Sequence, residues 1–443
     1  MRKIRCIIIA IGFMALSCWA IVSVAASGGD AMELHIVYVH DPLLPAISDN
    51  DLEMIIDEAL VTYNTKFQAK SFSIVNEGRI DVQDFFNTYL DKESPQYRRS
   101  VSERIDIFGE NNPNMYVKDV VRFFKANKWK PWDIQKFLKD YYTAEELAEM
   151  KTYPALAKAT LPVYFEKVKK LTELRQPDGR PYLEQGKDYN SYMNWTLVMA
   201  AQDKYDVIIC NTLIVYDVAT QPWPHAALRF AKVGGSSFVS PRRPVFDGRT
   251  IMINLFEMLC SDEYFQSQYT AYNLTQMDWN RIIGSYIMAH EMGHMVYLIP
   301  DLYDIPRGCI MDSSEESMNY YTGWKNMQDN PDPCPQLQPW VAAREQVFKA
   351  DALYRSGKYD DAVAVYKNAA KATPELLDEN IYGAYMALLA YKQALCYKAK
   401  GDAAAASAKI KKAKYLLREY YTDVDDYYNE EFKTYVENLV NGL

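Results

Sequence analysis

His290-Glu291-Met292-Gly293-His294 is an HExxH motif, in which three residues separate two histidines. Apolar residues recur at helical spacing before it, Thr275 is a typical helix cap, and Pro300 is a typical helix stop, so the sequence predicts a helix over residues 276–297. The two imidazoles then lie one turn apart on one face and can bind the same Zn²⁺. Glu291 lies next to them and can accept a proton from a zinc-bound water, then pass it to a leaving amine.

Two structural histidines on a buried apolar stripe are the alternative interpretation of this motif. The chain has five histidines in 443 residues, so chance predicts an HExxH pattern only about 0.004 times in a chain of this composition. The Glu291 carboxylate would also be costly beside a buried stripe unless a cation were near. The other histidines, His35, His40 and His225, lack metal-like spacing, and we interpret them as structural or surface residues.

The candidate third ligand follows the helix. The continuation Pro300-Asp301-Leu302-Tyr303-Asp304 resembles the secreted immune-inhibitor-A-type peptidases of the metzincin clan, in which the aspartate after the proline is the third metal ligand. The resemblance implies a zinc site made by His290, His294 and Asp301. The chain departs from that family at Tyr297, where the family has the glycine that makes the turn, and it has one extra residue before Pro-Asp. Asp304 is the nearest substitute ligand.

A gluzincin arrangement is the other alternative for the third ligand. It would use a glutamate on a later helix, and Glu315 or Glu316 lies about twenty residues after the motif. In the same region, Cys309-Ile310-Met311-Asp312 resembles the Met-turn of metzincins, which places a methionine beneath the zinc. Met318 is the rival candidate for that methionine.

The cysteines of this region give a separate prediction. The segment is loosely similar to archaemetzincins, which bind a second, structural zinc through four cysteines. In this chain Leu337 stands where the partner of Cys334 should be, so the sequence does not support a second zinc. We predict instead that Cys309 and Cys334 form a disulfide.

The order of the predicted elements indicates an α+β fold. Strand patterns at residues 34–39 and 71–75 flank a helix pattern at residues 51–66, and further strand patterns precede the motif helix, at residues 205–215, 234–239 and 250–255. This order is similar to the upper subdomain of metzincins, in which the irregular edge strand, residues 234–239 here, binds substrate backbone. The resemblance implies a peptidase domain with a mixed twisted sheet over residues 27–336. Residues 110–200 are predicted to be a helical insertion in it.

The last part of the chain, residues 337–443, is predicted to be an all-α domain. It resembles a short tetratricopeptide array of helical hairpins, with an ordinary helical bundle as the alternative. The matching residues are Ala350, Leu353, Gly357, Tyr359, Ala362, Tyr366, Ala369 and Pro374 in the first copy and Ala394, Tyr397, Gly401, Ala406, Ile410 and Ala413 in the second. The junction is short and proline-containing, so this domain should dock on the peptidase domain and offer a surface for a protein partner. A chain that ends near residue 336 is expected to keep its zinc.

The N-terminus and the charge bound the partners and the location. Residues 1–26 have a basic start and a long apolar run and are predicted to be a signal peptide, which implies a secreted or periplasmic, cell-envelope protein. A retained membrane anchor is the alternative, and a membrane contact is expected only in that case. The formal charge is −9 and there is no basic tract, which excludes nucleic acid as an expected partner.

Three functions fit these observations. The first is a zinc metallopeptidase that hydrolyses peptide or protein substrates. The second is a catalytically inactive peptidase fold that binds a partner through its helical repeats. The third is a zinc hydrolase that acts on a small amide. The sequence favours the first, because both histidines and Glu291 are present.

Overall fold

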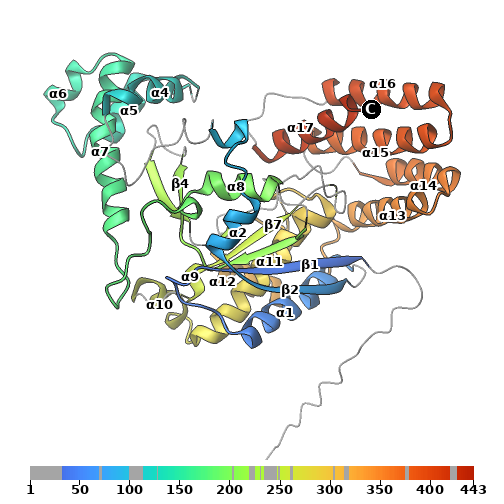
Figure 1. Ribbon diagram of the computed structural model, residues 1–443, viewed down its shortest axis with the longest axis horizontal. Helices are drawn as coiled ribbons and strands as arrows, with labels where there is room; N and C mark the ends of the chain where they lie inside the picture. Colours follow the sequence, from blue (N-terminus) through green and yellow to red (C-terminus); the bar gives the residue numbers. More distant parts are fainter. Residues whose placement is uncertain are drawn as a thin grey trace, which may run out of the picture.

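The computed structural model describes residues 32–68, 72–98, 113–126, 128–201, 204–218, 225–229, 231–233, 247, 250–259, 263–302, 305–313, 319–374, 379–419 and 427–443 (Figure 1). The predicted signal peptide, residues 1–26, and the predicted edge strand, residues 234–239, lie outside these ranges. None of the described helices combines the length and the apolar character needed to cross a membrane.

A five-stranded sheet lies at the centre of the larger part of the described chain. Its strand order is β2-β1-β3-β7-β6; the first four strands are parallel, and β6 pairs with β7 in the antiparallel direction. A separate antiparallel hairpin pairs β4 with β5. The strands are β1 Glu33–His40, β2 Ser73–Asp81, β3 Val207–Cys210, β4 Ile214–Val218, β5 His225–Arg229, β6 Ala231–Val233 and β7 Ile251–Leu255.

Different helices cover the two faces of the sheet, because successive side chains of a strand point to opposite faces. Ile36 and Tyr38 of β1 share a core with α1 and α11, whereas Val37 and Val39 share a core with α2 and α8. Figure 1 shows these two pairs of helices on opposite sides of the strands. The helices around the sheet are α1 Asp49–Phe67, α2 Val82–Tyr89, α8 Tyr192–Ala201, α9 Phe256–Leu259, α10 Glu263–Thr270, α11 Gln276–Tyr297 and α12 Tyr320–Asp329.

The described residues between α2 and α8 are mostly helical, as predicted for residues 110–200. It contains α4 Pro113–Ala126, α5 Pro131–Leu138, α6 Ala144–Glu149, α7 Tyr153–Glu173 and a 3₁₀ turn at Asp188–Asn190. Phe124, Ile134 and Leu161 belong to a core that is separate from those of the sheet. Helices α4 to α7 accordingly project from one end of the molecule (Figure 1).

The C-terminal part is formed by helices that pack on the sheet domain. They are α13 Gln338–Arg355, α14 Tyr359–Ala372, α15 Glu379–Ala399, α16 Ala403–Glu419 and α17 Tyr427–Asn441. Gly357 and Gly401 follow α13 and α15 with φ of 76° and 79°, the conformation that ends a helix and that glycine adopts readily. Trp340 and Tyr385 share one hydrophobic core with Tyr297 of α11, so the helices dock on the sheet domain. The described chain is therefore a mixed helix-and-sheet protein, which is compatible with the predicted α+β class.

Candidate metal centre

Helix α11 carries the HExxH motif and has the predicted bounds. Thr275 caps it: its hydroxyl accepts a hydrogen bond from the Asp278 N–H at 3.1 Å, and the Asp278 carboxylate accepts one from the Thr275 N–H at 3.2 Å. This reciprocal pair fixes the start of the helix. The C-terminal half of α11 is buried between α1 and the sheet, and it includes His290, Glu291 and His294.

The turn after α11 brings the chain back toward the motif. Leu298 adopts the left-handed conformation, with φ of 57° and ψ of 32°, and its N–H donates to the Gly293 carbonyl. This conformation costs a non-glycine residue roughly 1–2 kcal/mol, and the complete burial of the Leu298 side chain offsets that cost. The chain therefore turns at Leu298, directly after Tyr297, and this turn does not need a glycine at position 297.

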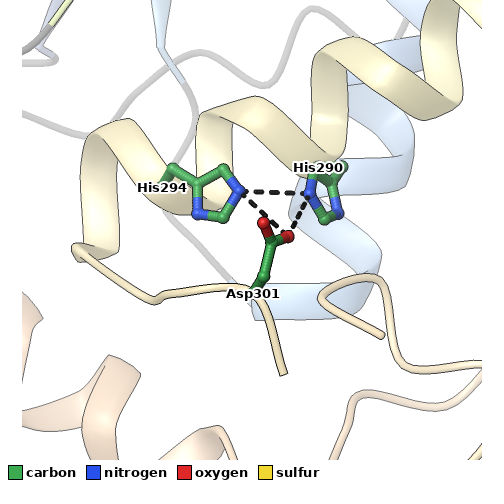
Figure 2. Close-up of side chains that lie close together, drawn as sticks. All are labelled: His290, His294 and Asp301. Carbon is green, nitrogen blue, oxygen red and sulfur yellow. Dashed lines mark hydrogen bonds and ion pairs between the residues drawn. The ribbon is translucent and has the colours of Figure 1, made fainter. Parts of the chain in front are cut away.

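Because of this turn, Asp301 lies next to the two histidines. The His290 and His294 Nε2 atoms are 3.1 Å apart, and the Asp301 Oδ1 atom is 3.2 Å from the first and 3.5 Å from the second (Figure 2). In the part of the chain that the structure describes, these three residues are the group of His, Cys, Asp and Glu side chains that could hold a metal ion.

The size of this triangle fits a tetrahedral zinc site. Zinc bonds to histidine nitrogen and carboxylate oxygen of about 2.0–2.1 Å place neighbouring ligand atoms roughly 3.3–3.4 Å apart, because the edge of a tetrahedron is about 1.63 times its centre-to-corner distance. The three observed separations, 3.1, 3.2 and 3.5 Å, lie around that value. Three protein ligands leave the fourth position for water or substrate, as in catalytic zinc sites.

Backbone carbonyls orient both imidazoles. The Nδ1 atoms of His290 and His294 lie 2.7 Å from the Ile310 carbonyl oxygen and 2.5 Å from the Ile299 carbonyl oxygen, respectively. A carbonyl can only accept, so each Nδ1 carries the proton and donates it, and each neutral ring presents the lone pair of Nε2. Two such lone pairs and a carboxylate oxygen face one another. These electron-rich atoms repel one another unless a cation or a proton lies between them.

The pKa shifts of Asp301 and His294 both indicate that this cluster favours a bound positive charge. Burial by itself raises the pKa of the Asp301 carboxyl, but contacts with His290 and His294 outweigh it and hold that pKa well below the ordinary value. Burial by itself lowers the pKa of His294, but the carboxylates of Asp301 and Glu291 raise it overall. The Ser313 hydroxyl also donates to Asp301 Oδ1 at 2.5 Å, which holds the carboxylate in place.

A methionine lies beneath the motif helix. Met311 is fully buried against Gly293, and a Cβ added to this glycine would lie 2.8 Å from Phe67 Cζ and still closer to the Met311 sulfur. The ligand segment also pairs with this turn, since the Leu302 N–H donates to the Met311 carbonyl at 3.0 Å. Met311, the residue of the predicted Met-turn, therefore packs against the motif helix at Gly293. The rival Met318 and the alternative ligands, Asp304, Glu315 and Glu316, lie outside the described residues.

The predicted disulfide is wrong for this structure. Cys309 and Cys334 are buried free thiols. They are nevertheless neighbours: their hydrogen bond raises the pKa of Cys309 and, against burial, lowers the pKa of Cys334 to about 7. The two predicted partners are therefore in contact, but no sulfur–sulfur bond is formed.

Some residues that build the site were missed by sequence reasoning. Ser313 and the carbonyls of Ile299 and Ile310 carry no motif, because a backbone acceptor leaves no signal in side-chain identity. Of the other histidines, His35 forms a partly buried contact with Glu77 at 2.9 Å, and the Nδ1 atom of His40 lies 3.4 Å from the Asn211 amide nitrogen.

Comparison of the chain with protein-family models, with curated proteins and with solved structures found no match.

Proposed function

We propose that this protein is a zinc-dependent metallopeptidase. The observation that carries the proposal is the triangle of His290 Nε2, His294 Nε2 and Asp301 Oδ1, whose dimensions and tautomers suit a tetrahedral zinc ion with one open position. Backbone acceptors on both histidines add the outer contacts that such sites use to orient their ligands.

The residues divide the chemistry between them. Zn²⁺, when bound, supplies a Lewis acid that polarises a carbonyl group and makes a water molecule more acidic. His290, His294 and Asp301 hold the ion. Glu291 accepts the proton of the attacking water and then donates it to the leaving amine. Its side chain is fully buried, and its negative charge helps to raise the pKa of His294.

A metzincin-like fold is our proposal for the peptidase domain. It is supported by the parallel order β2-β1-β3-β7, by the antiparallel edge strand β6 and by Met311 beneath the motif helix. An extended peptide could bind by adding a strand alongside β6, since main-chain hydrogen bonds need no particular side chains. This would give a peptide or protein substrate rather than a small amide.

The C-terminal helices and the location complete the proposal. The paired helices α13–α14 and α15–α16, each joined at a glycine with positive φ, support a tetratricopeptide-like array. We propose a protein partner for it, and a secreted or cell-envelope location on the basis of residues 1–26. The alternative function is an inactive peptidase fold that binds a partner through these helices.

Metal analysis and library cleavage test the proposal together. We expect one zinc per chain in the wild type, at least about 100-fold weaker zinc binding in Asp301→Asn, and unchanged binding in the exposed control Asp140→Asn. Glu291→Gln should keep its zinc and lose about 10²–10⁴-fold in peptide cleavage. The exposed control Glu149→Gln should keep both properties.

The outcomes separate the candidate functions. A wild-type protein that binds no zinc would refute the proposed site. A protein that binds zinc but cleaves no peptide of the library favours the inactive binding protein, and full zinc binding by Asp301→Asn would remove Asp301 from the ligand set.

A further inference from the structure

Two side chains of α13 bind the end of the motif helix. The Trp340 indole N–H donates to the Tyr297 carbonyl at 2.7 Å, and the Arg344 Nε–H donates to the Val296 carbonyl at 3.0 Å. Both side chains are buried, Arg344 completely. The last four carbonyls of a helix have no partner within the helix, so α13 satisfies two of those that α11 leaves open. The guanidinium also places a positive charge at the negative end of the helix dipole.

The segment held in this way leads directly to the third ligand. Leu298, which follows Tyr297, makes the left-handed turn. The Ile299 carbonyl then accepts from His294 Nδ1, and Asp301 is two residues further on. The backbone is therefore fixed by α13 before the turn and by a ligand histidine within it. The residue types do not specify this turn, because neither Tyr297 nor Leu298 favours the left-handed conformation.

A buried ionic network holds Arg344 itself. Its guanidinium pairs with the Asp247 carboxylate. Lys392 of α15 pairs with the same carboxylate at 2.8 Å and with Asp351 of α13 at 2.9 Å. These contacts tie α13 to α15 and to residue 247 of the sheet domain, so Arg344 reaches Val296 from a rigid support.

We propose that Trp340 and Arg344 are positioning residues of the metal centre. They hold the Val296 and Tyr297 carbonyls so that the turn at Leu298 presents Asp301 to the histidines. The C-terminal helices then stabilise the backbone next to the metal site and also offer a surface for a partner. This inference rests on the proposed zinc site.

The test measures zinc affinity in matched tryptophan variants. Trp340→Phe keeps an aromatic ring and removes the N–H donor. Trp195→Phe is the control, because Trp195 is fully buried and its indole N–H also donates to a carbonyl, that of Tyr189, at 2.7 Å, but in the core on the opposite face of the sheet. Zinc affinity is measured by competition with a chelator, the visible spectrum of the Co²⁺-loaded protein reports ligand geometry, and urea unfolding of the metal-free proteins reports stability.

We expect zinc to bind about 10–100-fold more weakly to Trp340→Phe, with an altered Co²⁺ spectrum. Trp195→Phe should lose comparable stability but bind zinc within about threefold of the wild type. Equal zinc affinities and spectra in the two variants would overturn the inference, since Trp340 would then be only structural.

A second variant covers the case in which Trp340→Phe does not fold. Arg344→Lys retains a charge for Asp247 and removes the Nε donor to Val296, and it should also weaken zinc binding and change the Co²⁺ spectrum. Wild-type affinity and spectrum in Arg344→Lys would reject the inference. A wild-type protein that binds no metal would instead refute the proposed function, so the two failures are distinguishable.

Discussion

Replacement of Gly293 by alanine tests the packing of the motif helix on the turn beneath it. In the middle of a helix this substitution normally stabilises a protein by about 1 kcal/mol. At this position the new methyl group would lie 2.8 Å from Phe67 Cζ and closer still to the Met311 sulfur. Both neighbours are fully buried, so neither has free space to move into.

The expected magnitude follows from these two effects. Overpacking of a dense core costs about 1–3 kcal/mol, and the contacts place Gly293→Ala in the upper part of that range. After the helix-propensity gain, the net loss should be about 1–2 kcal/mol. Gly284→Ala is the control on the same helix, where the methyl group would lie no closer than 3.0 Å to atoms of the Ile55 side chain. That variant should remain within about 1 kcal/mol of the wild type.

Urea unfolding of the two metal-free variants measures this difference. Zinc affinity should also fall in Gly293→Ala alone, because the displaced turn carries the Ile310 carbonyl that orients His290. If Gly293→Ala were as stable as Gly284→Ala and bound zinc equally well, the close contact with Met311 would not exist and the argument would be refuted.

Three further predictions follow from contacts away from the ligands. Arg344 and Lys392 outweigh burial and lower the pKa of Asp247 from 3.8 to about 2, so the stabilisation by this carboxylate is present above pH 4 and is lost as the pH falls toward 2. The difference in unfolding free energy between the wild type and Asp247→Asn should therefore shrink by about 2 kcal/mol over that interval. A constant difference would contradict the pairing. A chain that ends at residue 336 loses Trp340 and the other C-terminal residues of the core that the sheet domain shares with the C-terminal helices, so we now expect it to aggregate or to lack cooperative unfolding. A soluble, zinc-binding fragment would show that the sheet domain folds independently of the C-terminal helices. Cys309 and Cys334 are each 6% exposed, so iodoacetamide should label both only after unfolding without reductant; failure to label them then would indicate a disulfide.

The sequence predicted best what local patterns determine. The bounds of α11 depend on Thr275, on the apolar spacing and on Pro300, which are all near in the sequence, and the structure confirms them. Asp301 came from a resemblance, and the structure brings it to the histidines. The turn that does so could not be predicted, because a left-handed Leu298 is stabilised by its burial and by a helix that begins forty residues later.

The long strand predicted at residues 205–215 shows another limit of local patterns. The structure divides it into β3 and β4. Asn211 lies at the break: its side chain accepts from the Asp41 N–H at 2.7 Å and donates to the Pro45 carbonyl at 2.9 Å. A polar residue that binds a distant loop has no periodic signature. The partners of Arg344 are equally hidden, because residues 247 and 296 are far from it in the chain.

The left-handed Leu298 has a consequence for the biogenesis of the protein. Chains emerge from the ribosome N-terminus first and fold in part as they emerge, so the motif helix is synthesised well before α13. Until Trp340 and Arg344 arrive, the turn that sets Asp301 lacks two of its supports. A nascent or truncated chain would then offer metal ions only the two histidines of α11. Tight metal loading should therefore be a late event and a marker of the finished chain. For the peptidase that we propose, this order would keep incomplete products from hydrolysing their neighbours.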